Sequence, residues 1–191
     1  MSDLAGFLSQ LEAALTRLDR HGLLQALRPG LSGAEVQERL GSVGLKSNAE
    51  LEALYGWGDG TSTKGVAAVG DIHMFPGFYL LSLEDAIANY RAFVTDRRWS
   101  SGWLPIFANG GGDFYVVDLG SQDERSVRHF RIDESEHPIE FSSIKNMLRT
   151  LTQAFERGVF FVDAGGYLEM DDLVFGTLAA ELNPHIVWWT E

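Results

Sequence analysis

The chain has 191 residues, of which 45% are hydrophobic and 22% are charged, close to the averages for globular domains. Its 27 acidic and 15 basic residues give a net charge of −12, and such a chain repels nucleic-acid phosphates and anionic lipid. The absence of cysteine excludes disulfides and thiolate metal sites and suits a reducing compartment.

The N-terminal segment predicts an amphipathic helix. Apolar residues recur there at helical spacing, namely Leu4, Phe7, Leu8, Leu11, Leu15 and Leu18. The segment lacks a basic start followed by an apolar run, and no window of the chain has the roughly 20 apolar residues that a membrane span needs. We therefore expect no signal peptide and no membrane partner, and a cytoplasmic location.

Two short helices are predicted next. Ser32 and Glu35 have the spacing of a capping box, in which each side chain binds the backbone N–H of the other residue. Ser47 and Glu50 repeat this spacing before a second helix, which the glycines of residues 56–60 end. Residues 72–81 are rich in β-forming residues but are interrupted by Pro76-Gly77, and Ser82 with Asp85 caps a further helix.

The middle of the chain is the most β-like part. Residues 104–107, 114–119 and 126–132 predict three consecutive antiparallel strands. Further elements follow: a helix over about 142–155, an apolar run at 160–162, a Gly165-Gly166 turn and a helix over about 171–182. This order predicts a single α+β domain over residues 1–191, with an antiparallel central sheet covered by helices mainly on one side.

No pattern in the sequence indicates catalysis, and we expect no catalytic residue, no metal site and no cofactor. The histidines have no metal-ligand spacing, and no Gly-x-Ser-x-Gly motif is present. The glycines of residues 109–113 lead into a strand rather than a helix, and Asp113 would repel a phosphate. We interpret this motif as a turn in which glycine allows positive φ and Asp113 accepts hydrogen bonds from loop N–H groups.

Two acidic segments are candidates for binding a protein partner. The first contains Asp133, Glu134, Glu136 and Glu140. The second contains Asp163, Glu169, Asp171 and Asp172, beside Tyr167 and Met170. Segments with one sign of charge steer a partner of opposite charge, and the alternative is that both are solvated loops without a partner.

Two stretches resemble the SUKH superfamily, of the Smi/Knr type. Residues 51–60 (LEALYGWGDG) are similar to its helix-plus-turn, and residues 103–119 (WLPIFANGGGDFYVVDL) to its Trp-x-Pro, Gly-Gly-Gly-Asp and Asp-Leu strand pattern. The resemblance spans about 31–155, which leaves an N-terminal helix in 1–30 and a C-terminal extension at 158–191. It implies a role in forming the fold for Tyr55, Trp57, Asp59, Gly60, Trp103, Pro105, Gly110, Gly111, Gly112, Asp113 and Asp118.

The resemblance implies an α+β fold without catalytic residues. Bacterial members of the superfamily are inferred to be immunity proteins of polymorphic or contact-dependent toxin systems, many of them against nucleases, and fungal members regulate glucan synthesis and cell-wall assembly. We therefore expect a protein-binding module, a monomer or weak dimer, whose partner is a basic toxin domain. The alternatives are an adaptor without a toxin partner, and an enzyme or ligand binder with a pocket under Trp57, Trp99 and Trp103.

Overall fold

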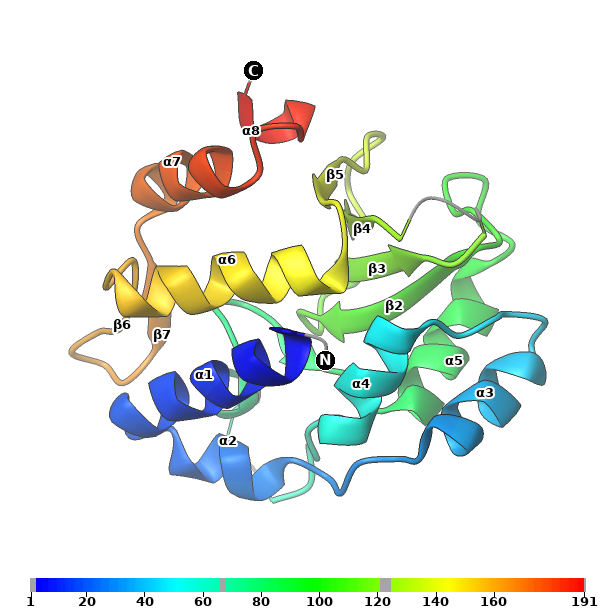
Figure 1. The fold of residues 1–191 in the computed structure, drawn as a ribbon, viewed down its shortest axis with the longest axis horizontal. Helices are drawn as coiled ribbons and strands as arrows, with labels where there is room; N and C mark the ends of the chain where they lie inside the picture. The colour runs from blue at the N-terminus through cyan, green and yellow to red at the C-terminus, as the bar shows by residue number, and fades with distance from the viewer. Residues whose placement is uncertain (1–2, 66–67, 121–124, 191) are drawn as a thin grey trace.

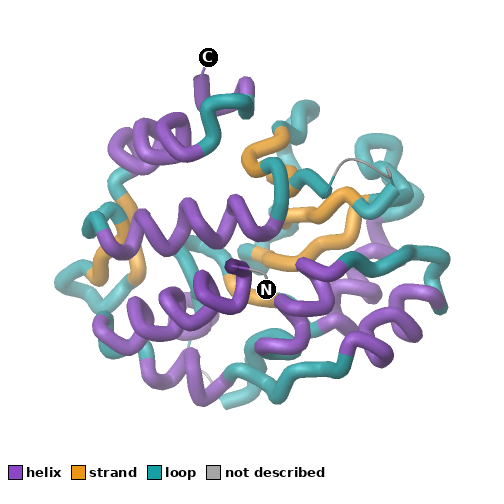
Figure 2. Tube along the Cα trace, viewed as in Figure 1, coloured by secondary structure: helices purple, strands orange, loops and turns teal. Residues whose placement is uncertain are grey.

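The structure of the protein is a computed structural model that describes residues 3–65, 68–120 and 125–190 (Figures 1 and 2). Its helices are α1 (Asp3–Arg17), α2 (His21–Ala26), α3 (Gly33–Gly41), α4 (Ala49–Trp57), the 3-10 helix η1 (Val69–Ile72), α5 (Leu83–Phe93), α6 (Ile144–Glu156), α7 (Asp172–Leu182) and α8 (Val187–Thr190). Its strands are β1 (Tyr79–Leu80), β2 (Trp103–Ala108), β3 (Phe114–Asp118), β4 (Val127–Phe130), β5 (Ile139–Phe141), β6 (Phe160–Val162) and β7 (Leu168–Met170). This architecture confirms the predicted α+β class.

The central sheet has the antiparallel order β1-β2-β3-β4-β5, so each strand pairs with the next one along the chain. Strands β2, β3 and β4 confirm the three predicted strands. Every residue of β2 and β3 is buried, and Figure 1 shows α5 behind the sheet with α4 and α6 in front. Both faces of the sheet centre are therefore covered, and the expectation of a sheet covered mainly on one side was wrong.

Helix α1 lies beside α6 and shares the core of the sheet (Figure 1). Leu4, Leu11 and Leu15 of α1 are fully buried, and α6 buries a stripe at the same spacing, which includes Ile144, Leu148, Leu151 and Phe155. Full burial of one such side chain contributes roughly 1.5–3 kcal/mol. The N-terminal helix is thus an integral part of the core.

The helix caps confirm one predicted start and correct another. At α3, Ser32 Oγ accepts a hydrogen bond from the N–H of Glu35, and the Glu35 carboxylate accepts one from the N–H of Ser32 at 2.8 Å. At α4, however, the N-cap is Asn48, whose Oδ1 accepts from the N–H of Leu51 at 2.9 Å. Ser47 donates to a glutamate within the helix instead, so the predicted capping box at that position was wrong.

The segment after α6 forms a hairpin and two helices at one side of the molecule (Figure 1). Strands β6 and β7 make a separate two-stranded sheet in which Phe161 pairs with Glu169. Helix α8 docks on β5 through Trp189, whose indole N–H donates to the backbone oxygen of Glu140 at 2.6 Å. Its neighbour Trp188 is exposed. The two terminal tryptophans therefore have different roles, one in packing and one at the surface.

Candidate functional site

The triple-glycine motif joins β2 to β3 as a turn that its own polar groups stabilise. Gly110 and Gly112 have φ angles of 82° and 110°, which favour glycine. Asn109 Oδ1 accepts hydrogen bonds from the N–H groups of Gly111 at 2.7 Å and Asp113 at 3.1 Å. The expectation that Asp113 accepts the loop N–H groups was wrong, because the side chain that folds back over the turn and accepts them is that of Asn109.

Asp113 instead ties the turn to the residues that follow β4. Its Oδ1 accepts from the N–H of Ile132 at 2.8 Å, and its Oδ2 accepts from the side-chain amide of Asn109 at 2.9 Å. A Cβ added to Gly112 would lie 3.2 Å from the Cβ of Ile132, so glycine also permits this close approach. Both oxygens of this carboxylate are thus used within the fold.

The second motif, the helix α4 with its following turn, connects to the start of α5. Asp59 Oδ1 accepts from the N–H of Leu83 at 2.7 Å. Gly60 has a φ of 76°, and a Cβ at this position would lie 2.2 Å from the backbone nitrogen of Ser82. Tyr55 is fully buried, and this burial, with smaller effects of Asp59 and a second aspartate, raises the pKa of its hydroxyl. Asp59 and Gly60 therefore fix the turn after α4 against the start of α5.

The remaining motif residues lie in or beside the sheet. The indole N–H of Trp103 donates to Asp118 Oδ2 at 3.3 Å, and Asp118 Oδ1 accepts from the N–H of Gly120 at 2.9 Å. Pro105 lies at a register shift of the β2–β3 pairing, between Pro105 and Phe107. A bulge of this kind tolerates a residue without an N–H.

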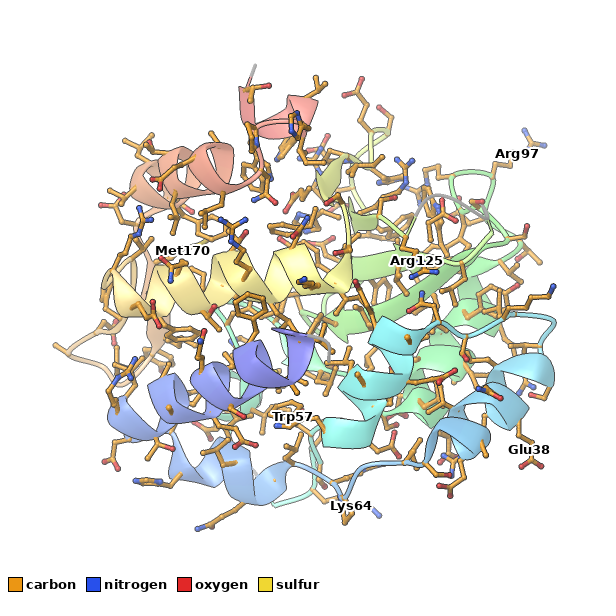
Figure 3. All side chains as sticks on the ribbon, viewed as in Figure 1. Glu38, Trp57, Lys64, Arg97, Arg125 and Met170 are labelled. Atoms are coloured by element: carbon orange, nitrogen blue, oxygen red, sulfur yellow. The ribbon has the colours of Figure 1, made fainter. Side chains whose placement is uncertain are left out.

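The three tryptophans of the ligand-binding alternative pack in or against the hydrophobic core. Trp99 and Trp103 are 6% and 8% exposed, and their ring centroids lie 6.0 Å apart. Trp57 lies beside α1, where its indole N–H donates to Glu12 Oε1 at 2.5 Å (Figure 3). Their contacts explain these rings as packing residues and do not support the ligand-binding alternative.

The polar side chains of the described residues do not assemble a metal site. No group of three or more His, Asp or Glu side chains in residues 3–65, 68–120 and 125–190 is placed to hold a metal ion. Over the same ranges, no helix combines the length and the apolar character that crossing a membrane requires.

The first acidic segment lies between β4 and β5, and arginines surround it. Asp133, Glu134 and Glu136 are exposed. Arg98 donates to the backbone oxygen of Glu134 at 3.4 Å, and Arg131 donates to that of Glu136 at 3.2 Å. Both contacts are to backbone oxygens, and the carboxylate that pairs with Arg98 is that of Asp96, at 2.9 Å.

Glu140 differs from the other members of the first segment because it is only 3% exposed. Its Oε2 accepts a hydrogen bond from the hydroxyl of Tyr115 at 2.8 Å, and its Oε1 lies 3.0 Å from His129 Nδ1. Burial, and then the charge of Glu140, raise the pKa of Tyr115, which keeps the hydroxyl protonated as a donor. This carboxylate faces the core, so we leave it out of the candidate surface.

The second acidic segment lies on the β6–β7 hairpin and at the start of α7, where two of its carboxylates shape the backbone. Asp163 Oδ1 accepts from the N–H of Tyr167 at 2.9 Å and so forms the hairpin turn. Asp171 Oδ1 accepts from the N–H of Val174 at 3.1 Å and so caps α7.

The other two carboxylates of this segment are exposed and unpaired. The side-chain carboxylates of Glu169 and Asp172 make no hydrogen bond or ion pair with any described residue. Figure 3 shows the exposed Arg97 at the opposite side of the molecule from Met170, which marks the hairpin.

A comparison with models of known protein families matches residues 32–150 to the SMI1 / KNR4 family (SUKH-1). This range covers more than half of the chain and includes both sequence motifs described above. The chain belongs to the SMI1 / KNR4 family. The match confirms the resemblance and agrees with its predicted limits to within a few residues. No curated protein was found to match the chain.

The range of the SMI1 / KNR4 match separates the two acidic segments, since the first lies inside it and the second beyond it. The large exposed apolar side chains of the described residues are also distributed unequally between the matched range and the residues after it. Val69 lies inside the matched range. The others follow it, namely Phe161, Tyr167, Leu173, Val174, Val187 and Trp188. In this SMI1 / KNR4 protein, most of the large exposed apolar side chains of the described residues thus lie in the C-terminal segment.

Our sequence reasoning found the acidic residues of this segment but missed its exposed apolar residues. A signal was present in the helix at 172–182, whose buried residues Phe175, Leu178 and Ala179 follow helical spacing. Leu173 and Val174 precede this stripe and stand next to two aspartates. Apolar residues outside the stripe of a surface helix are candidates for contact with another molecule.

Proposed function

We propose that this chain is a non-catalytic immunity protein, which binds a cognate toxin domain through its C-terminal segment. Membership of the SMI1 / KNR4 family supports the proposal, because many bacterial members of the superfamily are inferred to have this function. The observation that carries it is that most large exposed apolar side chains of the described residues lie within residues 161–188, the stretch of chain that also holds the exposed carboxylates of Glu169 and Asp172.

Such a surface has the chemistry of a protein-binding site. Leu173 is 86% exposed, Tyr167 is 61% exposed and Val187 is 60% exposed. Large apolar side chains with this much exposure are candidates for contact with another molecule, since water contact with them is unfavourable. The adjacent negative charge would steer a basic toxin domain to the same place, and many nucleases are basic because they bind phosphate backbones.

The direct test is protection of cells. The reading frames next to this gene are searched for a toxin domain, and each candidate is expressed in a sensitive bacterial host, alone and together with the chain. We expect the chain to restore growth and the two purified proteins to form a complex at a 1:1 ratio in size-exclusion chromatography. The association rate should fall steeply as salt is raised from about 50 to 500 mM, because salt screens exposed charges.

Two results would overturn the proposal. If the toxin domain kills cells equally well with and without the chain, and no complex forms, the chain is not its inhibitor. If the chain instead binds a protein of its own cell and protects against no toxin, it is an adaptor, which is the function that the fungal members of the superfamily suggest.

A further inference from the structure

The C-terminal segment and the family-matched region enclose a pocket between them. Its volume is about 330 Å³. One wall comes from residues 70–77, within and after η1, and the other from residues 167–172 of β7 and the start of α7. The aromatic ring of Tyr167 lies beside Gly70, where an added Cβ would be 3.9 Å from the ring carbon Cδ1. The pocket is therefore formed only where these two parts of the chain meet.

The chemistry of the pocket suits a positively charged side chain. Its lining residues include the acidic Glu169 and Asp172, the aromatic Tyr167 and the thioether residue Met170. None of its lining residues is a lysine or an arginine. An aromatic face attracts a cation, and the carboxylates add ion pairing while the aliphatic part of the side chain contacts apolar atoms.

The wall at residues 70–77 is held in place by Arg20, a positively charged residue that contacts the wall but is not among the residues lining the pocket. Arg20 donates to the backbone oxygens of Gly70 at 2.6 Å and His73 at 3.1 Å. Burial, and then the charge of Arg20, lower the pKa of the His73 imidazole. His73 is therefore neutral at pH 7, and the two carboxylates set the charge of the pocket.

An apolar groove lies on the other side of the α7 start. It has a volume of about 310 Å³ and is lined by Val159, Leu173, Val174 and Leu178, with Arg157 and Glu181 at its rim. Arg157 and Glu181 pair with each other at 2.8 and 2.9 Å, so the groove itself carries little net charge. Asp172 of the pocket and Leu173 of the groove are consecutive residues, which places the two hollows next to each other.

We propose that the pocket at residues 70–77 and 167–172 receives a lysine or arginine side chain of a protein partner, and that the groove beside it receives an apolar side chain of the same partner segment. The charge of the pocket selects the basic residue, and the exposed Leu173 and Val174 select the apolar one. That this partner is a toxin domain rests on the proposed function above, but the preference of the pocket for a cation does not.

The pocket is tested with two short peptides of the same shape. Acetyl-Leu-Gly-Arg-Gly-amide carries a guanidinium group, and the same peptide with citrulline in place of arginine carries none. We expect the arginine peptide to shift the backbone amide NMR signals of residues 70–77 and 167–172, with a Kd about ten-fold lower than that of the citrulline peptide. Equal binding of both peptides, or no shift at these residues, would overturn the proposal.

A matched pair of double variants separates the pocket from the general negative charge of the protein. Glu169→Gln with Asp172→Asn removes two charges at the pocket, and Asp133→Asn with Glu134→Gln removes two charges at the first acidic segment. All four side chains are exposed, so both variants should fold. The pocket variant should lose the preference for arginine and the control variant should keep it. Loss of the preference in both variants would show only a nonspecific effect of charge and would contradict the pocket.

The same variants distinguish failure of this inference from failure of the proposed function. With the toxin domain that the chain neutralises, the pocket variant should bind about ten-fold more weakly than the control variant. If the toxin binds both equally, the pocket is not its docking site, although the immunity function stands. If no toxin is neutralised but the peptide preference holds, the pocket stands and its partner is another basic protein.

Discussion

The family-matched region and the C-terminal segment use the same residue types in different ways. Within residues 32–150, the carboxylates of Asp59, Asp113 and Glu140 accept hydrogen bonds from other groups of the fold. After residue 150, Glu169 and Asp172 leave theirs exposed and unpaired among the described residues. A carboxylate that already accepts hydrogen bonds within the fold has fewer free acceptor positions for a partner. An unpaired carboxylate at the surface can still form ion pairs and hydrogen bonds with one. Asp133, Glu134 and Glu136 of the matched region are exposed as well, so the difference between the two regions concerns these five carboxylates and not every acidic residue.

The largest expected effect compares one glycine from each region. Gly60→Ala should lower the free energy of unfolding by about 3 kcal/mol, because φ is positive and the new Cβ meets the backbone of Ser82. Gly176→Ala, inside α7, has no atom within 4 Å of the new Cβ and should stabilise the protein by about 0.5–1 kcal/mol. Urea unfolding followed by circular dichroism measures both.

Equal effects of these two substitutions would break the comparison. If Gly60→Ala were harmless, the α4 turn would not be a rigid crossing, and the motif that led to the family would need another explanation. If Gly176→Ala were strongly destabilising, α7 would be packed on a face that we regard as open.

The sequence was sufficient for the elements that depend on local patterns. The β2–β3 hairpin was predicted from β-forming runs on both sides of a glycine turn, and the helices at 142–155 and 171–182 were predicted from apolar spacing. The strand β5 was missed, since Ile139–Phe141 is short and follows Pro138. Its pairing with β4 is a tertiary contact that no local pattern specifies.

The candidate site was less predictable for the same reason. Sequence shows that Glu134 and Glu140 are both acidic and close along the chain, but only the fold shows that one is exposed and the other buried. The pocket was not predicted at all, because residues 70–77 and 167–172 are about ninety positions apart. The sequence motifs were enough to identify the family. The pocket could be found only from the fold, which brings residues 70–77 and 167–172 together.

A second prediction concerns these two glutamates of the first acidic segment. Glu140→Ala should lower the free energy of unfolding by about 2 kcal/mol, because it leaves the buried Tyr115 hydroxyl without its acceptor. Glu134→Ala should change it by less than about 0.5 kcal/mol, since the side chain is exposed. Chemical unfolding at pH 7 measures the difference. A similar loss in both variants would mean that Glu140 is not a buried acceptor.

The smallest effect is expected at His73, on the pocket wall where the two regions meet. Because burial and Arg20 lower its pKa in the folded protein, the unfolded chain binds more protons near and just below pH 6.5, the usual value for histidine. The free energy of unfolding should therefore fall as pH drops from 7.5 to 5.5. His137 contributes in the same direction, through burial and then Arg98. His73→Gln should reduce this fall in the free energy of unfolding by the part that His73 contributes. If His73→Gln loses as much stability over this range as the unmodified chain, the imidazole is already open to solvent and the wall at residues 70–77 is not held closed by Arg20.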